Sequence, residues 1–378
     1  MGKVSINELT LTNIGAAIRE KTGKSDLIAP GDMPAEIRSI VSGGGGSDVE
    51  PIVLTGDCSY ACAGSLGGQY IDNFGNTVST KDITNANYMF YNSTAKHIPF
   101  QINVKQNTSI NLQGLFTESD LEEVPIVSKA KPLVLDQLFR NCTYLRSIPE
   151  GFANDWDFTV LNADTSNKHQ AIFQGCVSLR TIPESFLNQL WTPTTARNNI
   201  IYLYMFNSCH CLDEVIGLGV STGAFTANAL DSTFDQCNRL KNFTFAINED
   251  GTPKTASWSK QTLDLSYYVG YVMSSSYKIY ITNYNSGITG DKEVKDDATY
   301  QALKNDPDWF TLNEAYSRYN KESAVRTINS LPDTSATGNN TIKFKGTSGS
   351  ATDGGAINTM TEEVIAVAAA KGWTVAFA

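Results

Sequence analysis

The chain has 378 residues, of which 41% are hydrophobic and 10% aromatic, enough to form the cores of two or three folded domains. Its formal net charge of −10 excludes a nucleic-acid partner and an anionic membrane surface, because phosphate groups are bound by clustered Lys and Arg. No apolar run is long enough to cross a bilayer, so insertion into a membrane is not expected either.

Residues 1–41 are predicted to form a small unit of two short helices. Thr12 is placed to cap the first helix, and Asp32 with Pro34 suits the start of the second. The apolar faces of the two helices contain Ile14, Ile18, Ile37 and Ile40. Helices this short need a partner surface. The segment lacks the apolar core of a signal peptide, so the chain is expected to be made in the cytoplasm.

The next segments divide the chain into a linker and a repeat domain. Residues 42–50 form a Gly/Ser linker whose sequence SGGGGS is typical of a flexible tether. Residues 51–85 are predicted to cap the N-terminal side of a repeat domain over 86–250. Residues 251–378 are predicted to hold C-terminal repeats and a second cap.

The repeat domain contains six segments with one shared pattern. These segments, named repeats 1 to 6 from here on, are 88–99, 114–125, 137–149, 171–183, 204–216 and 232–244. Each has a Phe in its third position: Phe90, Phe116, Phe139, Phe173, Phe206 and Phe234. Three residues later the first two repeats have Ser93 and Ser119, and the last four have Cys142, Cys176, Cys209 and Cys237. The same four repeats then have Leu145, Leu179, Leu212 and Leu240.

The period of this pattern predicts the architecture. Successive repeats begin roughly 23 to 34 residues apart, within the range of solenoid repeats. Each repeat has an apolar edge that it cannot bury alone, so neighbouring repeats are expected to stack and share a core. The end of each repeat, Leu-x-x-Ile-Pro in repeats 3 and 4, favours one short strand. The predicted fold is an α/β-type repeat solenoid of short strands, loops and helical turns, preceded by the small helical anchor.

The C-terminal part is predicted to have a different alternation of elements. Aromatic and β-branched runs predict strands over 262–272, 276–284, 339–346 and 373–378. Helices are predicted over 306–320, 321–333 and 360–372. The final helix-strand-helix-strand order is expected to cap the stack.

The pattern of repeats 1 to 6 resembles the BspA-like class of leucine-rich repeats over residues 86–245. Residues 13–40, NIGAAIREKTGKSDLIAPGDMPAEIRSI, look like a segment common at the N-termini of bacteriophage tail and virion proteins. Residues 54–90 and 322–377 look like the flanks of the same repeats in phage structural proteins. Repeats 1 and 2 depart from the pattern, since Ser replaces Cys and one residue is missing before the Pro.

The resemblance implies a virion component that displays the repeats for adhesion to a host surface. The expected partners are other virion proteins for the N-terminal segment and a bacterial surface glycan or protein for the solenoid. A trimer is the family expectation for oligomeric state. No enzyme activity, catalytic residue or cofactor is expected. The alternatives are a purely structural capsid or tail decoration protein and, less favoured, a polysaccharide depolymerase.

The sequence Cys209-His210-Cys211 suggests a metal site when it is considered alone. A zinc site needs three or four converging ligands, whereas equivalent positions in stacked repeats lie in a row. We therefore expect the repeated Cys residues to be buried core thiols, and His210 and Cys211 to lie on a loop, with no metal. Cys58 and Cys62 are expected to be buried and reduced, although a disulfide bridge between them stays open.

Two further groups of residues are candidates for function. Acidic pairs at Glu122–Glu123, Asp155 with Asp157 and Asp213–Glu214 have the chemistry of glycoside hydrolysis, but nothing places two acids across a sugar, and solvated loop charges are expected. Aromatic residues in the loops between repeats are typical of a binding surface. The candidate receptor contacts are Trp156, Trp191 and Tyr202, with Tyr204, Tyr267, Tyr268 and Tyr271 as further exposed aromatics.

Overall fold

A computed structural model describes most of the chain between residues 52 and 377. The described residues are 52–163, 170–190, 203–219, 233, 234, 237, 240, 242–253, 262–264, 277–281, 291–294, 309–312, 321–336, 340–344 and 362–377. The predicted anchor residues Ile14, Ile18, Ile37 and Ile40 lie outside this part, as do Trp191, Tyr202, Tyr267, Tyr268 and Tyr271. Within it, no helix combines the length and the apolar character needed to cross a bilayer.

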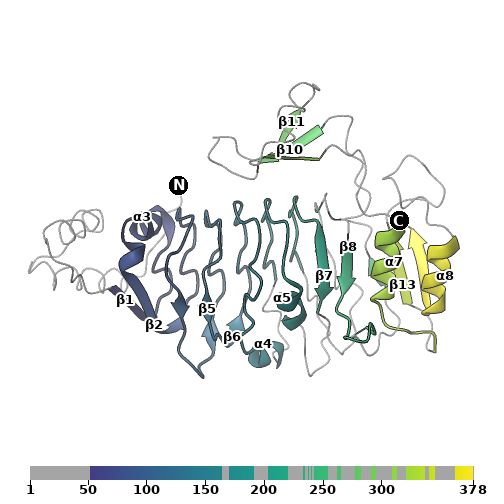
Figure 1. Cartoon of the computed structure of the whole chain (residues 1–378), viewed down its shortest axis with the longest axis horizontal. Coiled ribbons are helices and arrows are strands. Elements are labelled where there is room, and N and C mark those ends of the chain that lie inside the picture. Colours follow the sequence, from purple (N-terminus) through teal and green to yellow (C-terminus); the bar gives the residue numbers. More distant parts are fainter. Residues whose placement is uncertain are drawn as a thin grey trace, which may run out of the picture.

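The elements between residues 52 and 253 are mostly very short. The strands are β1 (Ile52–Asp57), β2 (Val78–Asn85), β3 (Ile102–Asn103), β4 (Ile110–Asn111), β5 (Val127–Ser128), β6 (Pro132–Val134), β7 (Glu214–Leu218) and β8 (Asn242–Phe245). The helices are α3 (Gly64–Phe74), the 3₁₀ helix η1 (Gly75–Thr77), α4 (Thr159–Ala163) and α5 (Glu184–Gln189). All strand pairs in this region are parallel, in the order β1-β2-β4-β6, with β3-β5 and β7-β8 as separate pairs. Figure 1 shows the chain passing repeatedly up and down between β2 and β8.

At the repeat Phe, the backbone hydrogen bonds between successive repeats all run from one repeat to the next. The N–H of Phe90 donates to the carbonyl of Leu115 at 2.9 Å, and the N–H of Phe116 donates to Leu138 at 3.0 Å. The equivalent bonds continue from Phe139 to Ile172, from Phe173 to Met205 and from Phe206 to Thr233. Each repeat therefore donates to the next one, and repeats 1 to 6 form a single stack.

The backbone conformation beside each Phe explains this pairing. Two residues before the Phe, φ is positive at Tyr88, Gly114, Gln137, Ala171 and Tyr204. Two residues after it, φ is positive at Asn92, Glu118, Asn141, Gly175 and Ser208. The N–H groups of these left-handed residues and of the Phe between them donate to the next repeat, as at Tyr88, Phe90 and Asn92. The N–H groups in between donate to a carbonyl three residues back in the same repeat, so every second N–H points at the next repeat.

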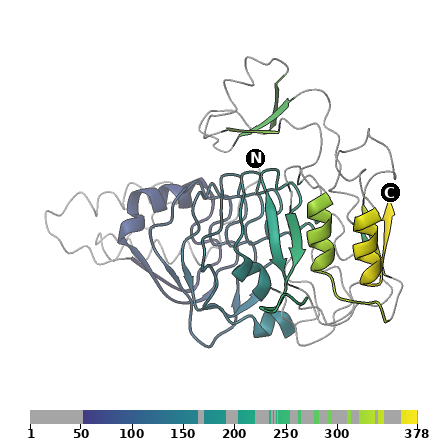
Figure 2. The same ribbon diagram turned by 45° about the vertical axis from the view of Figure 1, so that its right-hand side comes forward.

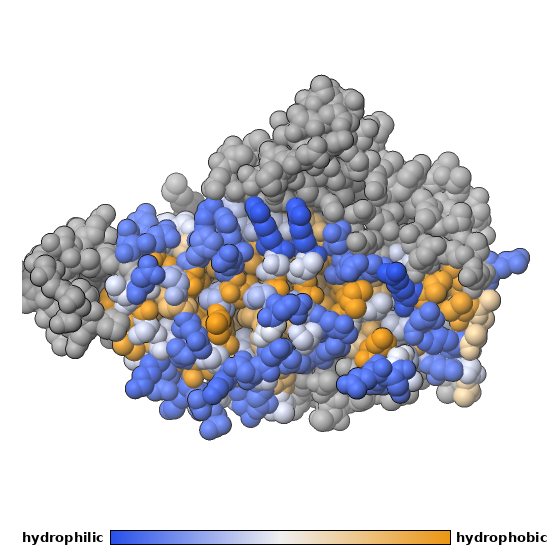
Figure 3. All heavy atoms as spheres, in the orientation of Figure 1, coloured by the Kyte–Doolittle hydropathy of each residue, from blue (hydrophilic) through white to orange (hydrophobic). Residues whose placement is uncertain are grey.

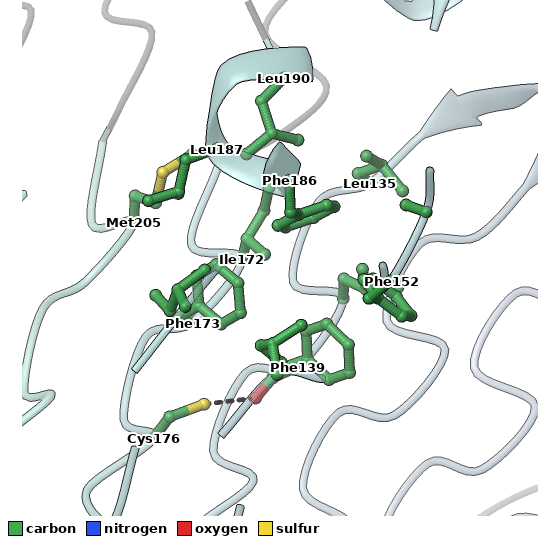
Figure 4. Close-up of a cluster of buried hydrophobic side chains, with 14 of the residues drawn as sticks. Leu135, Phe139, Phe152, Ile172, Phe173, Cys176, Phe186, Leu187, Leu190 and Met205 are labelled. Atoms are coloured by element: carbon green, nitrogen blue, oxygen red, sulfur yellow. Dashed lines mark hydrogen bonds between the residues drawn. The ribbon is translucent and has the colours of Figure 1, made fainter. Parts of the chain in front are cut away.

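The repeat Phe side chains form a ladder through the centre of the stack. Neighbouring rings lie 5.3 to 5.8 Å apart between Phe90, Phe116, Phe139, Phe173, Phe206 and Phe234. Their planes are nearly parallel, with angles of 6° to 16°, and all six are buried. Offset-stacked aromatic pairs contribute about 0.5 to 1.5 kcal/mol each beyond the burial of their area. Figure 4 shows Phe139 and Phe173 of this ladder, with Phe152 and Phe186 packed beside them.

The short strand expected at the end of each repeat is found only in part. In repeats 5 and 6 it is present as β7 and β8. In repeats 3 and 4 it is reduced to one parallel bridge between Ser147 and Thr181, because the Pro that follows two residues later has no N–H to extend the pairing. In repeats 1 and 2, which lack one residue before the Pro, β3 and β5 follow that Pro instead.

Residues 58–64 form an additional turn that the sequence pattern does not include. Cys62 has the position of the repeat Phe, and its N–H donates to the carbonyl of Met89 at 2.8 Å. Tyr60 and Gly64, two residues on either side, have positive φ as in the repeats. This segment, named the Cys62 turn, begins the stack ahead of repeat 1.

The C-terminal end of the stack is covered by helices. The elements there are β9 (Thr262–Asp264), α7 (Lys321–Asn329), β13 (Asn340–Phe344), α8 (Glu362–Ala370) and β14 (Trp373–Phe377), with parallel sheet order β14-β13-β9. Figures 1 and 2 both show α7 beside β8, with α8 further along and α3 at the opposite end. Thr327 on α7 donates to the carbonyl of Phe243 at 2.6 Å, so α7 caps repeat 6.

The predictions for the C-terminal elements are confirmed with one exception. Helices α7 and α8 and strands β9, β13 and β14 lie within the predicted ranges, and so does β10 (Tyr277–Ile281). The helix predicted over 306–320 is wrong at β12 (Trp309–Leu312), which pairs antiparallel with β10 in the order β11-β10-β12. Strand β11 covers Asp291–Val294. The sequence WFTL is rich in β-formers, and this local preference outweighs the helical spacing of the longer segment.

Candidate functional site

The repeated Cys residues form a ladder of thiol hydrogen bonds. Cys142, Cys176, Cys209 and Cys237 each donate to the carbonyl of the Phe in the preceding repeat, at 2.9 to 3.0 Å. All four are buried, and none of them is in a disulfide. Burial raises the pKa of Cys142 to about 12 and holds the pKa values of Cys176 and Cys209 well above the ordinary value. The thiols of Cys142, Cys176 and Cys209 are therefore protonated at neutral pH, which makes them poor nucleophiles and poor metal ligands.

The Cys209-His210-Cys211 stretch does not gather ligands around one point. Cys211 lies in a turn, as expected of a loop residue, but its side chain is buried, and its N–H donates to the carbonyl of Val177 at 3.2 Å. His210 is partly exposed. In the part of the chain that the structure describes, no group of three or more His, Cys, Asp or Glu is placed to hold a metal ion.

Cys58 and Cys62 are both buried and free rather than joined in a bridge. Burial raises the pKa of Cys58 to about 11 and raises the pKa of Cys62 further. Cys62 fills the core position that Phe90 has in the next repeat, so its role is packing.

The residues of the acidic pairs bind cationic, amide or backbone N–H groups of adjacent repeats and loops. Glu122 accepts a bond from Lys96 at 2.7 Å, and Glu123 lies 3.6 Å from His97. Asp157 pairs with Lys131 at 2.8 Å, and a hydrogen bond from Lys131 lowers the pKa of Asp157 to about 2. Glu214 accepts from the Asn242 amide at 2.6 Å, and Asp155 accepts from the backbone N–H of Lys129 at 2.9 Å. These partners come from adjacent repeats or loops and not from opposed walls of a cleft.

Trp156, a predicted receptor contact, is buried. Its side chain is 6% exposed, and its indole N–H donates to the carbonyl of Val127 at 2.7 Å. It also packs against Phe152 and Phe158. The prediction of a surface role for Trp156 is wrong, because the loop around it folds back onto the core.

The structure instead places aromatic side chains on one ridge of the stack. We name this surface the Tyr ridge. Each repeat contributes four residues to it, at positions −3, −2, +1 and +2 relative to the Phe. The Cys62 turn contributes the residues at the same four positions relative to Cys62. The aromatic members of the ridge are Tyr60, Tyr88, Tyr91 and Tyr204. Tyr204 is 41% exposed and the other three are half-buried. The ridge combines aromatic rings with solvent access, as a binding surface requires.

Three of these Tyr residues form one cluster. The rings of Tyr60 and Tyr88 are stacked, with centroids 5.3 Å apart and planes inclined by 22°. Tyr91 packs edge-on against both, at 5.7 Å from Tyr88 and 6.4 Å from Tyr60. The hydroxyl of Tyr88 reaches the Gln137 Oε1 atom, 3.4 Å away in repeat 3. The cluster therefore lies on two adjacent turns, and its contact with Gln137 reaches two turns further along the stack.

The remaining side chains of the ridge are mainly amides and hydroxyls. They include Ser59, Asn87, Asn92, Gln113, Gln137, Asn141, Gln170, Gln174, Asn207 and Ser208, with the charged residues Glu118, Asp136 and Arg140 in the middle. Figure 3 shows how hydrophilic side chains border the stack while apolar side chains lie in a band between them. Burial raises the pKa values of Tyr88 and Tyr91, so both phenols stay neutral at physiological pH. The ridge can bind a ligand by stacking and by neutral hydrogen bonds.

The sequence contained a signal for this ridge. Tyr60-Ala61-Cys62, Tyr88-Met89-Phe90 and Tyr204-Met205-Phe206 each place a Tyr two residues before the core position. The Phe alignment explains the core but leaves these Tyr residues unexplained.

Comparison of the chain with protein-family models, curated proteins and solved structures finds no match.

Proposed function

We propose that the chain is a phage structural protein whose stack of repeats is a BspA-like leucine-rich-repeat solenoid for adhesion to a host surface. The observation that carries the proposal is the Tyr ridge, an extended row of aromatic, amide and hydroxyl groups at regular spacing along the stack. Repeat stacks commonly bind partners through such extended surfaces. The resemblance of residues 13–40 to virion N-termini supports attachment to the particle.

The mechanism is reversible binding and not bond cleavage. Residues 1–41 attach the chain to other virion proteins, and the linker over 42–50 gives the repeats reach. Several copies on one particle raise the effective concentration of the ridge at the cell surface, so weak single contacts become strong together. The protonated buried thiols and the paired acids support a non-catalytic role.

A second candidate is a purely structural decoration protein, and one observation favours it. Apolar side chains are exposed at the N-terminal end of the stack, with Val53 at 48%, Leu66 at 46% and Ile52 at 37%. An exposed apolar group of this kind suits contact with another protein. On this alternative the repeats contact only virion components.

Binding of the purified full chain to the host strain in which the particle grows tests the proposal. We expect labelled protein to bind the cells, and an excess of it to block adsorption of the particle. Intact protein that neither binds cells nor blocks adsorption contradicts adhesion. An electron-microscopy reconstruction of the particle with the ridge buried between subunits favours the decoration role.

A further inference from the structure

The Tyr residues of the ridge occupy a backbone position that disfavours them. Tyr60, Tyr88 and Tyr204 have φ of 57°, 52° and 57°, in the left-handed region. A bulky side chain rarely adopts this conformation, whereas Gly adopts it freely. The next repeat in the stack shows this, since Gly114 has the same position with φ 59°. Each of the three Tyr residues is therefore present despite a conformational cost.

The fold does not require an aromatic ring at this position. Gly114, Gln137 and Ala171 have it in repeats 2 to 4, and the backbone bonds between those repeats are unchanged. The rings also lie outside the buried Phe ladder, since Tyr204 is 41% exposed and Tyr88 is half-buried. The left-handed backbone is common to all of these turns, so the feature particular to Tyr60, Tyr88 and Tyr204 is the ring itself. This separates the rings from the core and indicates a contact with something outside the chain.

The geometry of the cluster selects the kind of ligand. Tyr60, Tyr88 and Tyr91 touch one another, with centroids 5.3 to 6.4 Å apart, so there is no space between them for a cation, as in an aromatic cage. The acidic chain, with a net charge of −10, disfavours an anionic ligand. What the surface offers is a flat aromatic group bordered by amides and hydroxyls.

We infer that the Tyr ridge binds a neutral glycan, with a sugar ring packed on the Tyr60–Tyr88–Tyr91 cluster. The inference rests on the proposed adhesive function and names its ligand class. A pyranose has one apolar C–H face, which packs on an aromatic ring, and a rim of hydroxyls, which pair with amides and carboxylates. Gln137 contacts the Tyr88 hydroxyl, and Glu118 accepts a hydrogen bond from the Tyr91 hydroxyl. Both residues therefore lie at the edge of the cluster, where they can bond sugar hydroxyls.

The spacing of the stack suits a linear chain of sugars. Neighbouring turns lie about 4.8 Å apart where backbone hydrogen bonds join them. Tyr204 has the position of Tyr88 four repeats further on, which places the two about 19 Å apart along the stack. Gly114, Gln137 and Ala171 hold that position in the three repeats between them. Tyr204 is therefore positioned to contact a distant sugar of the same chain.

An array of immobilised oligosaccharides tests the inference with the full chain as probe. The array holds neutral hexose and N-acetylhexosamine chains beside chains that carry uronic or sialic acids. We expect binding to neutral chains, a loss of about 5- to 10-fold in Tyr88→Ala and in Tyr60→Ala, and a change within about twofold in Tyr88→Phe, which keeps the ring. Tyr88→Gly is a second variant, because Gly suits the left-handed backbone and removes the ring without strain.

The matched control is Tyr144→Ala. Tyr144 lies in repeat 3 of the stack but outside the ridge, and the Lys96 ammonium is 5.5 Å from the centre of its ring. Its loss is expected to leave glycan binding unchanged. Equal binding by wild type, Tyr88→Ala and Tyr88→Gly overturns the placement of the site.

The outcomes separate this inference from the proposed function. An array without signal on neutral chains, or with signal on anionic chains alone, overturns the neutral-glycan inference. Cell binding that survives periodate oxidation of the surface glycans indicates a protein receptor, which also overturns it while adhesion stands. Neutral chains bound on the array without any binding to host cells support the glycan site and overturn adhesion.

Discussion

Cys176 donates its thiol hydrogen bond to the carbonyl oxygen of Phe139 in the preceding repeat, at 2.9 Å (Figure 4). The same carbonyl accepts the backbone N–H of Cys142 at 3.0 Å, so both of its lone pairs are used inside the core. A carbonyl in this position would otherwise be buried with one acceptor site unfilled. The small thiol therefore joins two repeats inside the core.

Replacing Cys176 by Ala should destabilise the stack by about 1 to 3 kcal/mol, because a buried contact and a hydrogen bond are lost together. Cys176→Ser should cost less, since Ser93 and Ser119 have this position in repeats 1 and 2. Chemical denaturation followed by far-ultraviolet circular dichroism measures both. An Ala variant as stable as wild type would show that the thiol bond contributes nothing.

The row of buried Cys residues that contains Cys176 could be predicted from the sequence. The hydrogen bond from the Cys176 thiol to the Phe139 carbonyl could not. The spacing of Phe173 and Cys176 repeats in register, and a shared core follows from that period. The acceptor of the thiol depends on left-handed residues such as Gln137 and Ala171, which have no strong sequence signature. The Cys62 turn was missed for the same reason, since Cys replaces the Phe on which the repeats align.

Alkaline pH should unfold the protein through the buried thiols. An unfolded thiol has a pKa near 9.0, and burial raises the pKa of Cys142 to about 12 and of Cys58 to about 11. Because the folded pKa is raised, the stability from each thiol is complete below pH 9 and is lost as the pH rises toward the folded pKa. Between these values each thiol costs about 1.4 kcal/mol per pH unit.

Thermal melts at a series of pH values from 8 to about 12 check this expectation. Cys142→Ser removes one titrating group, so its melting temperature should fall less steeply than that of wild type above pH 9. Thiol-reactive reagents should modify the seven buried cysteine thiols only after denaturant is added. Parallel curves for wild type and Cys142→Ser would contradict a role for this thiol.

Gly114→Ala should destabilise the protein by about 1 to 3 kcal/mol for two separate reasons. Gly114 has a left-handed φ of 59°, and a Cβ atom there would collide with the ring of Tyr88. In a Tyr88→Ala background the collision is removed, and only the backbone cost of about 1 kcal/mol should remain. A double-mutant cycle by denaturation measures the coupling. Additive effects of the two substitutions would show that the ring does not lie over the glycine.

The Tyr ridge could be predicted less well than the core, and the predicted contact Trp156 shows why. Both Trp156 and Tyr88 are aromatic residues outside the repeat pattern, so composition alone does not separate them. The separation depends on tertiary contacts, because Trp156 finds the Val127 carbonyl as a buried partner and Tyr88 lies on a surface turn. A Tyr placed at a fixed offset from the core position was the better signal.

Thr327→Val should weaken the C-terminal cap while leaving the core repeats unaltered. The Thr327 hydroxyl donates to the Phe243 carbonyl at 2.6 Å. The Ser330 hydroxyl, directly after α7, accepts the Phe245 N–H at 3.0 Å. These two bonds pair backbone groups at the outer edge of β8. Val has the same shape but no donor, and a buried carbonyl left unpaired costs about 1 to 3 kcal/mol. Hydrogen exchange should show faster exchange in β8 than in repeats 3 and 4, because each repeat is stabilised mainly by its neighbours. The exposed Asn329→Ala on the same helix is the control. Uniform loss of protection across all repeats would indicate that the cap and the stack unfold as one unit.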